Sequence, residues 1–76
     1  MKKIVLFTTT ACPHCANART YLKSFGLDFE EKNVREDMDA RQELIEKRIL
    51  GVPTFFIDED IIVGFNRRKL ENALKN

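Results

Sequence analysis

The sequence predicts an α/β domain with the element order β-α-β-α-β-β-α and a four-stranded mixed sheet flanked by helices. Two short apolar runs, residues 3–7 and 54–57, are rich in the residues that favour β-strands. Two longer stretches, residues 13–25 and 35–49, carry apolar residues at helical spacing. Because the chain has only 76 residues and no linker or repeat, we expect one domain, 1–76.

The first three elements should form a βαβ unit. Residues 3–7 are predicted to be a buried strand, followed by a loop over residues 8–11 and a helix over residues 13–25. Gly26 is suited to end that helix, because glycine readily adopts the left-handed conformation. Residues 28–34 alternate only partly and indicate a second, less hydrophobic strand. Such strands lie parallel, joined by a right-handed crossover.

The second helix is predicted over residues 35–49 and should end at Gly51. Its expected apolar face consists of Met38, Leu44, Ile45 and Ile49. This face should pack on the sheet, while the charged remainder faces solvent.

The last third of the chain predicts a hairpin and a final helix. Residues 54–57 and 61–63 are the expected strands, joined by an acidic turn at residues 58–60. Asn66 should cap a helix that runs to Leu74.

A chain of this size buries only a modest core, so most large apolar residues should contribute to it. The two cysteines would close too short a loop to act as a structural staple. The predicted core residues are Ile4, Val5, Leu6, Phe7, Leu22, Phe25, Phe29, Leu44, Ile45, Ile49, Phe55, Phe56, Ile57, Ile62 and Leu70.

Composition narrows the classes of partner. The formal net charge is +1, and residues 67–69 are the only local basic excess, so we expect no nucleic-acid partner. The apolar run after Met1 is too short for a signal peptide, so we expect a cytoplasmic monomer without a membrane partner. In the cytoplasm a cysteine pair is more often catalytic or metal-binding than structural.

The most informative motif is Cys12-Pro13-His14-Cys15, which contains both cysteines of the chain. Proline fits the first turn of a helix, which places Cys12 at the N-cap beside unsatisfied N–H groups. The positive end of the helix dipole favours the thiolate of Cys12, and a protonated His14 would add positive charge.

The two thiols should not be equivalent. Cys15, Ala18, Leu22 and Phe25 fall on one stripe of the helix, so Cys15 should face the protein and Cys12 the solvent. This arrangement predicts an exposed attacking thiol and a shielded resolving thiol, which together make and break one disulfide.

On three motifs the chain resembles a glutaredoxin, within the thioredoxin-like fold, over nearly its whole length. They are Cys12-Pro13-His14-Cys15, Gly51-Val52-Pro53-Thr54 and Val63-Gly64-Phe65. The resemblance implies a dithiol–disulfide oxidoreductase in which Cys12 is the nucleophile and Cys15 resolves. It also implies a cis Val52–Pro53 bond, with the Val52 backbone beside Cys12 and free to pair with an extended substrate.

The resemblance further implies which residues form the site. The expected catalytic residues are Cys12, Pro13, His14 and Cys15. The expected substrate-binding residues are Thr10, Ala11, Val52, Pro53, Gly64 and Phe65.

Three departures from the family pattern concern glutathione. The family usually has tyrosine at the position of His14 and lysine at the position of Thr9. It also usually has a second glycine and aspartates before the last helix, where this chain has residues 63–67 with one glycine and no aspartate. Arg67 or Lys69 could replace part of the missing charge. In its Gly64-Phe65 pair the chain is similar to small glutaredoxin-like proteins that receive electrons from thioredoxin reductase. Protein disulfides are the expected substrates, with either glutathione or a reductase as electron donor and no tightly bound cofactor.

Two other functions stay open at this point. The cysteine pair could be half of a metal or iron–sulfur site, but a zinc site needs four ligands and the chain has one histidine and no further cysteine. We therefore expect no metal site within one chain. The second alternative is a non-catalytic adaptor that uses the fold as a docking surface, but such a protein would need neither cysteine.

His14 generates a test of the electrostatic argument. Stabilising the reduced thiolate form makes a disulfide a stronger oxidant, so the potential should lie above the roughly −270 mV of thioredoxin. Replacing His14 with an apolar residue should lower the potential measured by equilibration with a glutathione redox buffer. An unchanged potential would contradict the argument.

Overall fold

The computed structural model describes residues 3–10, 12–49 and 51–75. Its elements are β1 (Ile4–Thr8), α1 (Pro13–Ser24), β2 (Glu30–Asn33), α2 (Met38–Glu46), β3 (Thr54–Ile57), β4 (Asp60–Val63) and α3 (Arg67–Lys75). The sheet order is β2-β1-β3-β4, with β1 and β2 parallel and the other pairs antiparallel. The predicted element order and the mixed four-stranded sheet are confirmed.

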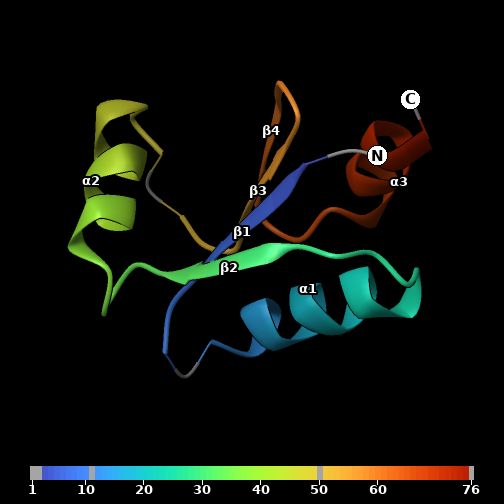
Figure 1. The fold of residues 1–76 in the computed structure, drawn as a ribbon, viewed down its shortest axis with the longest axis horizontal. Helices are drawn as coiled ribbons and strands as arrows, with labels where there is room; N and C mark the ends of the chain where they lie inside the picture. The colour runs from blue at the N-terminus through green and yellow to red at the C-terminus, as the bar shows by residue number, and fades with distance from the viewer. Residues whose placement is uncertain (1–2, 11, 50, 76) are drawn as a thin grey trace.

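The helices cover both faces of the sheet (Figure 1). Because side chains alternate along a strand, Ile4 and Leu6 face α1 and α3, whereas Phe7 faces α2. On the first face a cluster forms around Leu22 of α1 and Leu70 of α3. The smaller cluster on the other face consists of Phe7, Ala40 and Leu44, and the Phe56 ring lies 4.7 Å from that of Phe7.

Three residues predicted to be buried are instead exposed. Phe25 and Ile45 are each 52% exposed and Met38 is 65% exposed. Phe25 caps the end of α1, where its ring stacks edge-on against Tyr21 rather than entering the core. Met38 and Ile45 lie outside the narrow face of α2 that carries Ala40 and Leu44. The apolar stripe of α2 is therefore narrower than the sequence pattern predicts.

The ends of the helices explain the differences in their bounds. Gly26 has φ of 67°, and the N–H groups of Gly26 and Leu27 bond back to Lys23 and Leu22, which confirms its predicted role. The prediction that Gly51 ends the second helix is wrong. Arg48, with φ of 59°, adopts the left-handed conformation three residues earlier. At its start α2 is capped by Asp37, whose side chain accepts from the Ala40 N–H.

The hairpin and the last helix follow the prediction closely. Ile57 pairs with Asp60, so β4 begins one residue earlier than expected. The turn is tied to the start of β1, because the N–H of Lys3 donates to the Asp58 carboxylate over 2.9 Å. Asn66 caps α3 by accepting from the Lys69 N–H. By contrast, β2 is shorter than the predicted 28–34.

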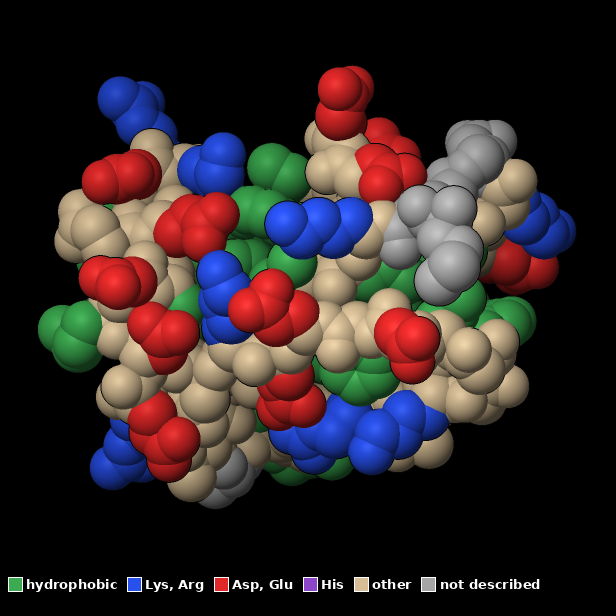
Figure 2. Space-filling model, in the orientation of Figure 1, with side chains coloured by type: hydrophobic (Ala, Val, Ile, Leu, Met, Phe, Trp, Pro, Cys, Tyr) green, Lys and Arg blue, Asp and Glu red, His purple; other side chains and the backbone are tan. Residues whose placement is uncertain are grey.

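Charges of both signs are interspersed on one face of the molecule. On the face drawn in Figure 2, Lys and Arg side chains lie among Asp and Glu side chains rather than in one basic patch. Within the described residues, no helix has the length and hydropathy that a membrane span requires.

The burial pattern predicts different costs for two neighbouring substitutions in α1. Leu22→Ala should lower the free energy of unfolding by about 2–5 kcal/mol, because it opens a cavity in the larger cluster. Phe25→Ala should cost about 1 kcal/mol or less, since it removes an exposed ring pair. Urea denaturation of both variants checks this, and equal costs would contradict the observed burial.

Candidate functional site

Three segments of the chain meet at one end of the sheet. Phe7, next to the end of β1, pairs with Thr54, the first residue of β3. Thr54 in turn pairs with Val63, the last residue of β4. The loop toward Cys12, the residue Pro53 and the residue Gly64 therefore leave the sheet at the same edge, as the course of the strands in Figure 1 shows.

Cys12 occupies the N-cap position of α1, as predicted. Its φ and ψ of −108° and 109° are extended, and Pro13 opens the first turn. The Cys12 Sγ accepts a hydrogen bond from the backbone N–H of Cys15 over 3.3 Å. The pKa of Cys12 is lowered, first by a bond from the Cys15 thiol and then by the backbone N–H groups of Cys15 and His14. The lowered pKa favours the thiolate form of this partly exposed sulfur.

Cys15 lies one turn further along α1 and is only 1% exposed. Burial, followed by the thiol–thiol hydrogen bond and the negative charge of Cys12, raises the pKa of Cys15 to about 11. The backbone of Thr9 and the charge of Arg19 oppose this rise. The predicted difference between an accessible and a shielded thiol is confirmed, and the raised pKa favours the protonated form of Cys15.

The segment 51–53 contains the expected cis peptide bond between Val52 and Pro53. Pro53 is buried, and its carbonyl accepts from the N–H of Gly64 over 2.7 Å. Gly64 has φ of 85°, a left-handed conformation that side chains rarely adopt. The structure thus brings Pro53 and Gly64 together. It does not test the position of a substrate against the Val52 backbone, which stays a prediction.

The remaining predicted site residues differ in their surroundings. Pro13 and His14 are exposed on the first turn of α1, and Thr10 is exposed and accepts from the Asn33 side chain over 3.2 Å. Phe65 is half-buried with its ring edge-on to Tyr21, 5.7 Å between centroids. It therefore packs against the core, and a role in binding substrate stays a prediction. Ala11 lies outside the described residues.

Two groups of residues near the site were missed by the sequence analysis. A groove of about 340 Å³ is lined by Thr9 of the loop after β1, by Val52 and by Arg41 of α2, with Val34, Leu44, Ile45, Ile49 and Gly51. An ion pair between Arg19 and Glu31 lies one helical turn beyond Cys15. Neither could be found from spacing, because each depends on how separate elements pack.

The structure also bears on metal binding. Within residues 3–10, 12–49 and 51–75, no three His, Cys, Asp or Glu side chains are grouped so that they could hold a metal ion. A metal or cluster held by the two thiolates would therefore need ligands from another molecule, and that alternative stays untested.

The hydrogen bond between the thiols predicts how Cys12 should titrate. Its alkylation by iodoacetamide should rise with pH through a midpoint below that of an ordinary thiol. Cys15→Ala removes the thiol donor and should raise that midpoint. Cys15→Ser keeps a hydroxyl donor and should raise it less. Identical midpoints in the wild type and the alanine variant would contradict the role given to Cys15.

Comparison with known proteins agrees with this arrangement. The family model described as Glutaredoxin matches residues 4–62. The chain is 38% identical to an uncharacterized glutaredoxin-like 8.6 kDa protein in the rubredoxin operon of Clostridium pasteurianum, over 95% of this chain and 97% of that protein. It is 32% identical to glutaredoxin 3 of Escherichia coli K12, over 84% and 78% of the two chains. The solved thioredoxin-like protein BC3987 superposes with a TM-score of 0.88 at 32% identity, over 93% of this chain and 99% of that chain. The chain belongs to the glutaredoxin family.

Proposed function

We propose that this protein reduces protein or mixed disulfides by dithiol exchange through Cys12 and Cys15. Membership of the glutaredoxin family supports a redox role of the thiol–disulfide oxidoreductase kind. The observation that carries the finer proposal is the inequality of the two thiols. Cys12 is partly exposed with a lowered pKa, and Cys15 is buried with a raised one.

In the first step the Cys12 thiolate attacks one sulfur of the substrate disulfide. A bond forms between Cys12 and that sulfur, and the other sulfur leaves as a thiolate that takes up a proton. The N–H group of Cys15 and the thiol of Cys15 hold the attacking sulfur at the end of the helix. Because Cys15 is protonated and buried, it does not compete for the substrate.

In the second step Cys15 loses its proton and attacks the Cys12 sulfur. The Cys12–substrate bond breaks, the substrate leaves as a second thiolate, and the two cysteines form a disulfide. Two electrons have then passed to the substrate. A donor must return two electrons and two protons before the next cycle.

Recognition of the substrate is proposed to use the segment before β3. The Val52 backbone precedes the cis Pro53, and Thr54 begins a strand whose start faces the site. An extended substrate pairing with this backbone would be bound through main-chain hydrogen bonds, with little dependence on its side chains. We therefore expect the protein to accept a broad range of protein disulfides as substrates.

Arg41 adds a candidate for contact with an acidic co-substrate. It lines the groove that begins at Thr9, where lysine is usual in the family. Glutathione carries carboxylates that an arginine can bind through two hydrogen bonds. If glutathione is the donor, Arg41 is a better-placed partner than Arg67, whose guanidinium lies over the Tyr21 ring.

The proposal is tested by supplying the two donors separately. Turnover of a protein disulfide should occur with NADPH and thioredoxin reductase, or with glutathione and glutathione reductase, monitored by loss of NADPH. Cys12→Ser should abolish turnover with either donor. Absence of turnover in the wild type with both donors, or full turnover in Cys12→Ser, would contradict the proposed function.

Matched variants then separate the donors. If glutathione serves, Arg41→Met should raise its KM several-fold, since a charge-assisted contact is lost, without changing turnover with thioredoxin reductase. Arg68→Met, an exposed arginine on α3, is the control and should change neither. Equal effects of the two substitutions would remove Arg41 from the glutathione site.

A further inference from the structure

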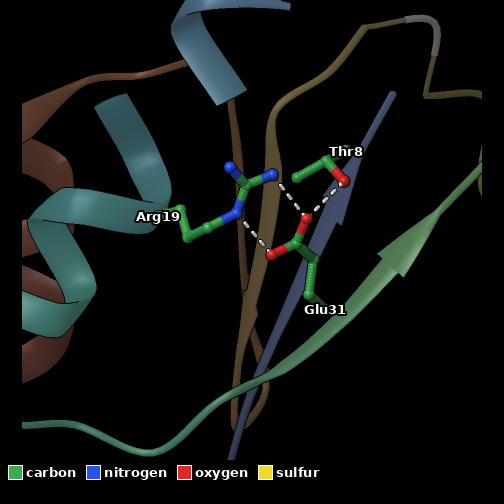
Figure 3. Close-up of polar contacts among 3 residues, drawn as sticks. All are labelled: Thr8, Arg19 and Glu31. Atoms are coloured by element: carbon green, nitrogen blue, oxygen red, sulfur yellow. Dashed lines mark hydrogen bonds and ion pairs between the residues drawn. The ribbon is translucent and has the colours of Figure 1, made fainter. Parts of the chain in front are cut away.

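Arg19 of α1 is held in one orientation by Glu31 of β2. Its Nε donates to Oε1 over 2.6 Å and its Nη2 donates to Oε2 over 2.7 Å (Figure 3). Two parallel charge-assisted bonds fix the plane of a guanidinium group as well as its position. The Arg19 side chain is therefore held in place, although it is about one-third exposed.

Glu31 is held in turn by a residue of the central strand. The hydroxyl of Thr8, which is completely buried, donates to Oε2 of Glu31 over 3.0 Å. Figure 3 shows the three side chains converging from α1, β1 and β2. The pKa of Glu31 is lowered by the Arg19 bond and further by Thr8, which favours the charged carboxylate.

Arg19 also stands four residues after Cys15 on the same helix. Side chains at this separation are neighbours on one helical face. Glu31 pairs in register with Leu6, whose side chain faces α1, so the ion pair lies between the helix and the sheet on the side of Cys15. The negative charge of Cys12 raises the pKa of the Cys15 thiol, and the positive charge of Arg19 lowers it.

The resolving step needs such a group. Before Cys15 can attack, its buried thiol must give up a proton, and burial disfavours the anion. When Cys12 is joined to a substrate it carries no charge, so its opposition to the Cys15 anion disappears. The positive charge of Arg19, one helical turn away from Cys15, remains.

We propose that Arg19, fixed by Glu31 and Thr8, is a positioning residue for resolution, whose charge stabilises the thiolate of Cys15 as it attacks Cys12. This rests on the proposed function and assigns Arg19 to its second step. Cys15 gives its proton to solvent or to the departing thiolate. Its sulfur then bonds to Cys12, and the Cys12–substrate bond breaks.

The aromatic disulfide DTNB separates the two steps. Attack by Cys12 releases one coloured thiolate, and attack by Cys15 on the resulting mixed disulfide releases the second, so stopped-flow absorbance records two phases. Arg19→Met should leave the first phase unchanged and slow the second. Each tenfold loss of Cys15 thiolate should slow it only about threefold, because the more basic thiolate that remains is a better nucleophile and partly compensates for the loss. The pH profile of the second phase should move to higher pH, and Arg19→Lys, which keeps the charge, should restore most of the rate.

Glu31→Gln distinguishes charge from mere attachment of α1 to the sheet. The glutamine oxygen can still accept from Arg19 and keep it in place. If the charge of Arg19 matters, removing its counter-charge should therefore leave the second phase as fast as in the wild type or faster. If the ion pair only ties the helix down, Glu31→Gln and Arg19→Met should both slow it. That result, or an unchanged second phase in Arg19→Met, would overturn the proposal. Failure of the proposed function would appear separately, as no turnover with either electron donor while both DTNB phases remain.

Discussion

The start of α1 at Cys12 is the constraint on which the site depends. The end of β1 delivers the chain to the edge of the sheet, Pro13 allows the helix to begin at once, and Cys12 becomes the cap. A sulfur at this position accepts from the Cys15 N–H, which also bonds to the Cys12 carbonyl over 3.1 Å. The helix that follows buries Cys15 against the sheet as part of the same face that buries Ala18 and Leu22. The core thus fixes the difference between the two thiols.

The features set by short segments were predictable from the sequence. Pro13 after the first cysteine, Gly26 after an apolar stripe and Asn66 before the last helix each act on their own neighbours, and each has the expected role. The end of α2 was not predictable in this way. Arg48, a non-glycine residue, takes the left-handed conformation there because the Arg48 and Ile49 N–H groups close the final turn.

Contacts between segments that are distant in the sequence could be identified only from the structure. The pairing of Thr8, Arg19 and Glu31 joins three elements through the register of two parallel strands, and sequence spacing does not give that register. Phe25 and Ile45 look like core residues, yet Phe25 caps the end of α1 and Ile45 lies outside the buried face of α2. The cis bond before Pro53 was expected from the family resemblance alone, because most X–Pro bonds in proteins are trans.

The electrostatic coupling of the two thiols would order the steps of the proposed reaction. Burial raises the pKa of Cys15, and the hydrogen bond between the thiols raises it further while it lowers the pKa of Cys12. In the proposed reaction the accessible sulfur of Cys12 therefore attacks first. Once Cys12 has bonded to a substrate, it is no longer an anion that accepts this hydrogen bond. The reason for Cys15 to stay protonated is then weaker, while Arg19 and the backbone of Thr9 still favour its anion. In the proposed mechanism, formation of the mixed disulfide therefore removes one of the causes that keep Cys15 protonated.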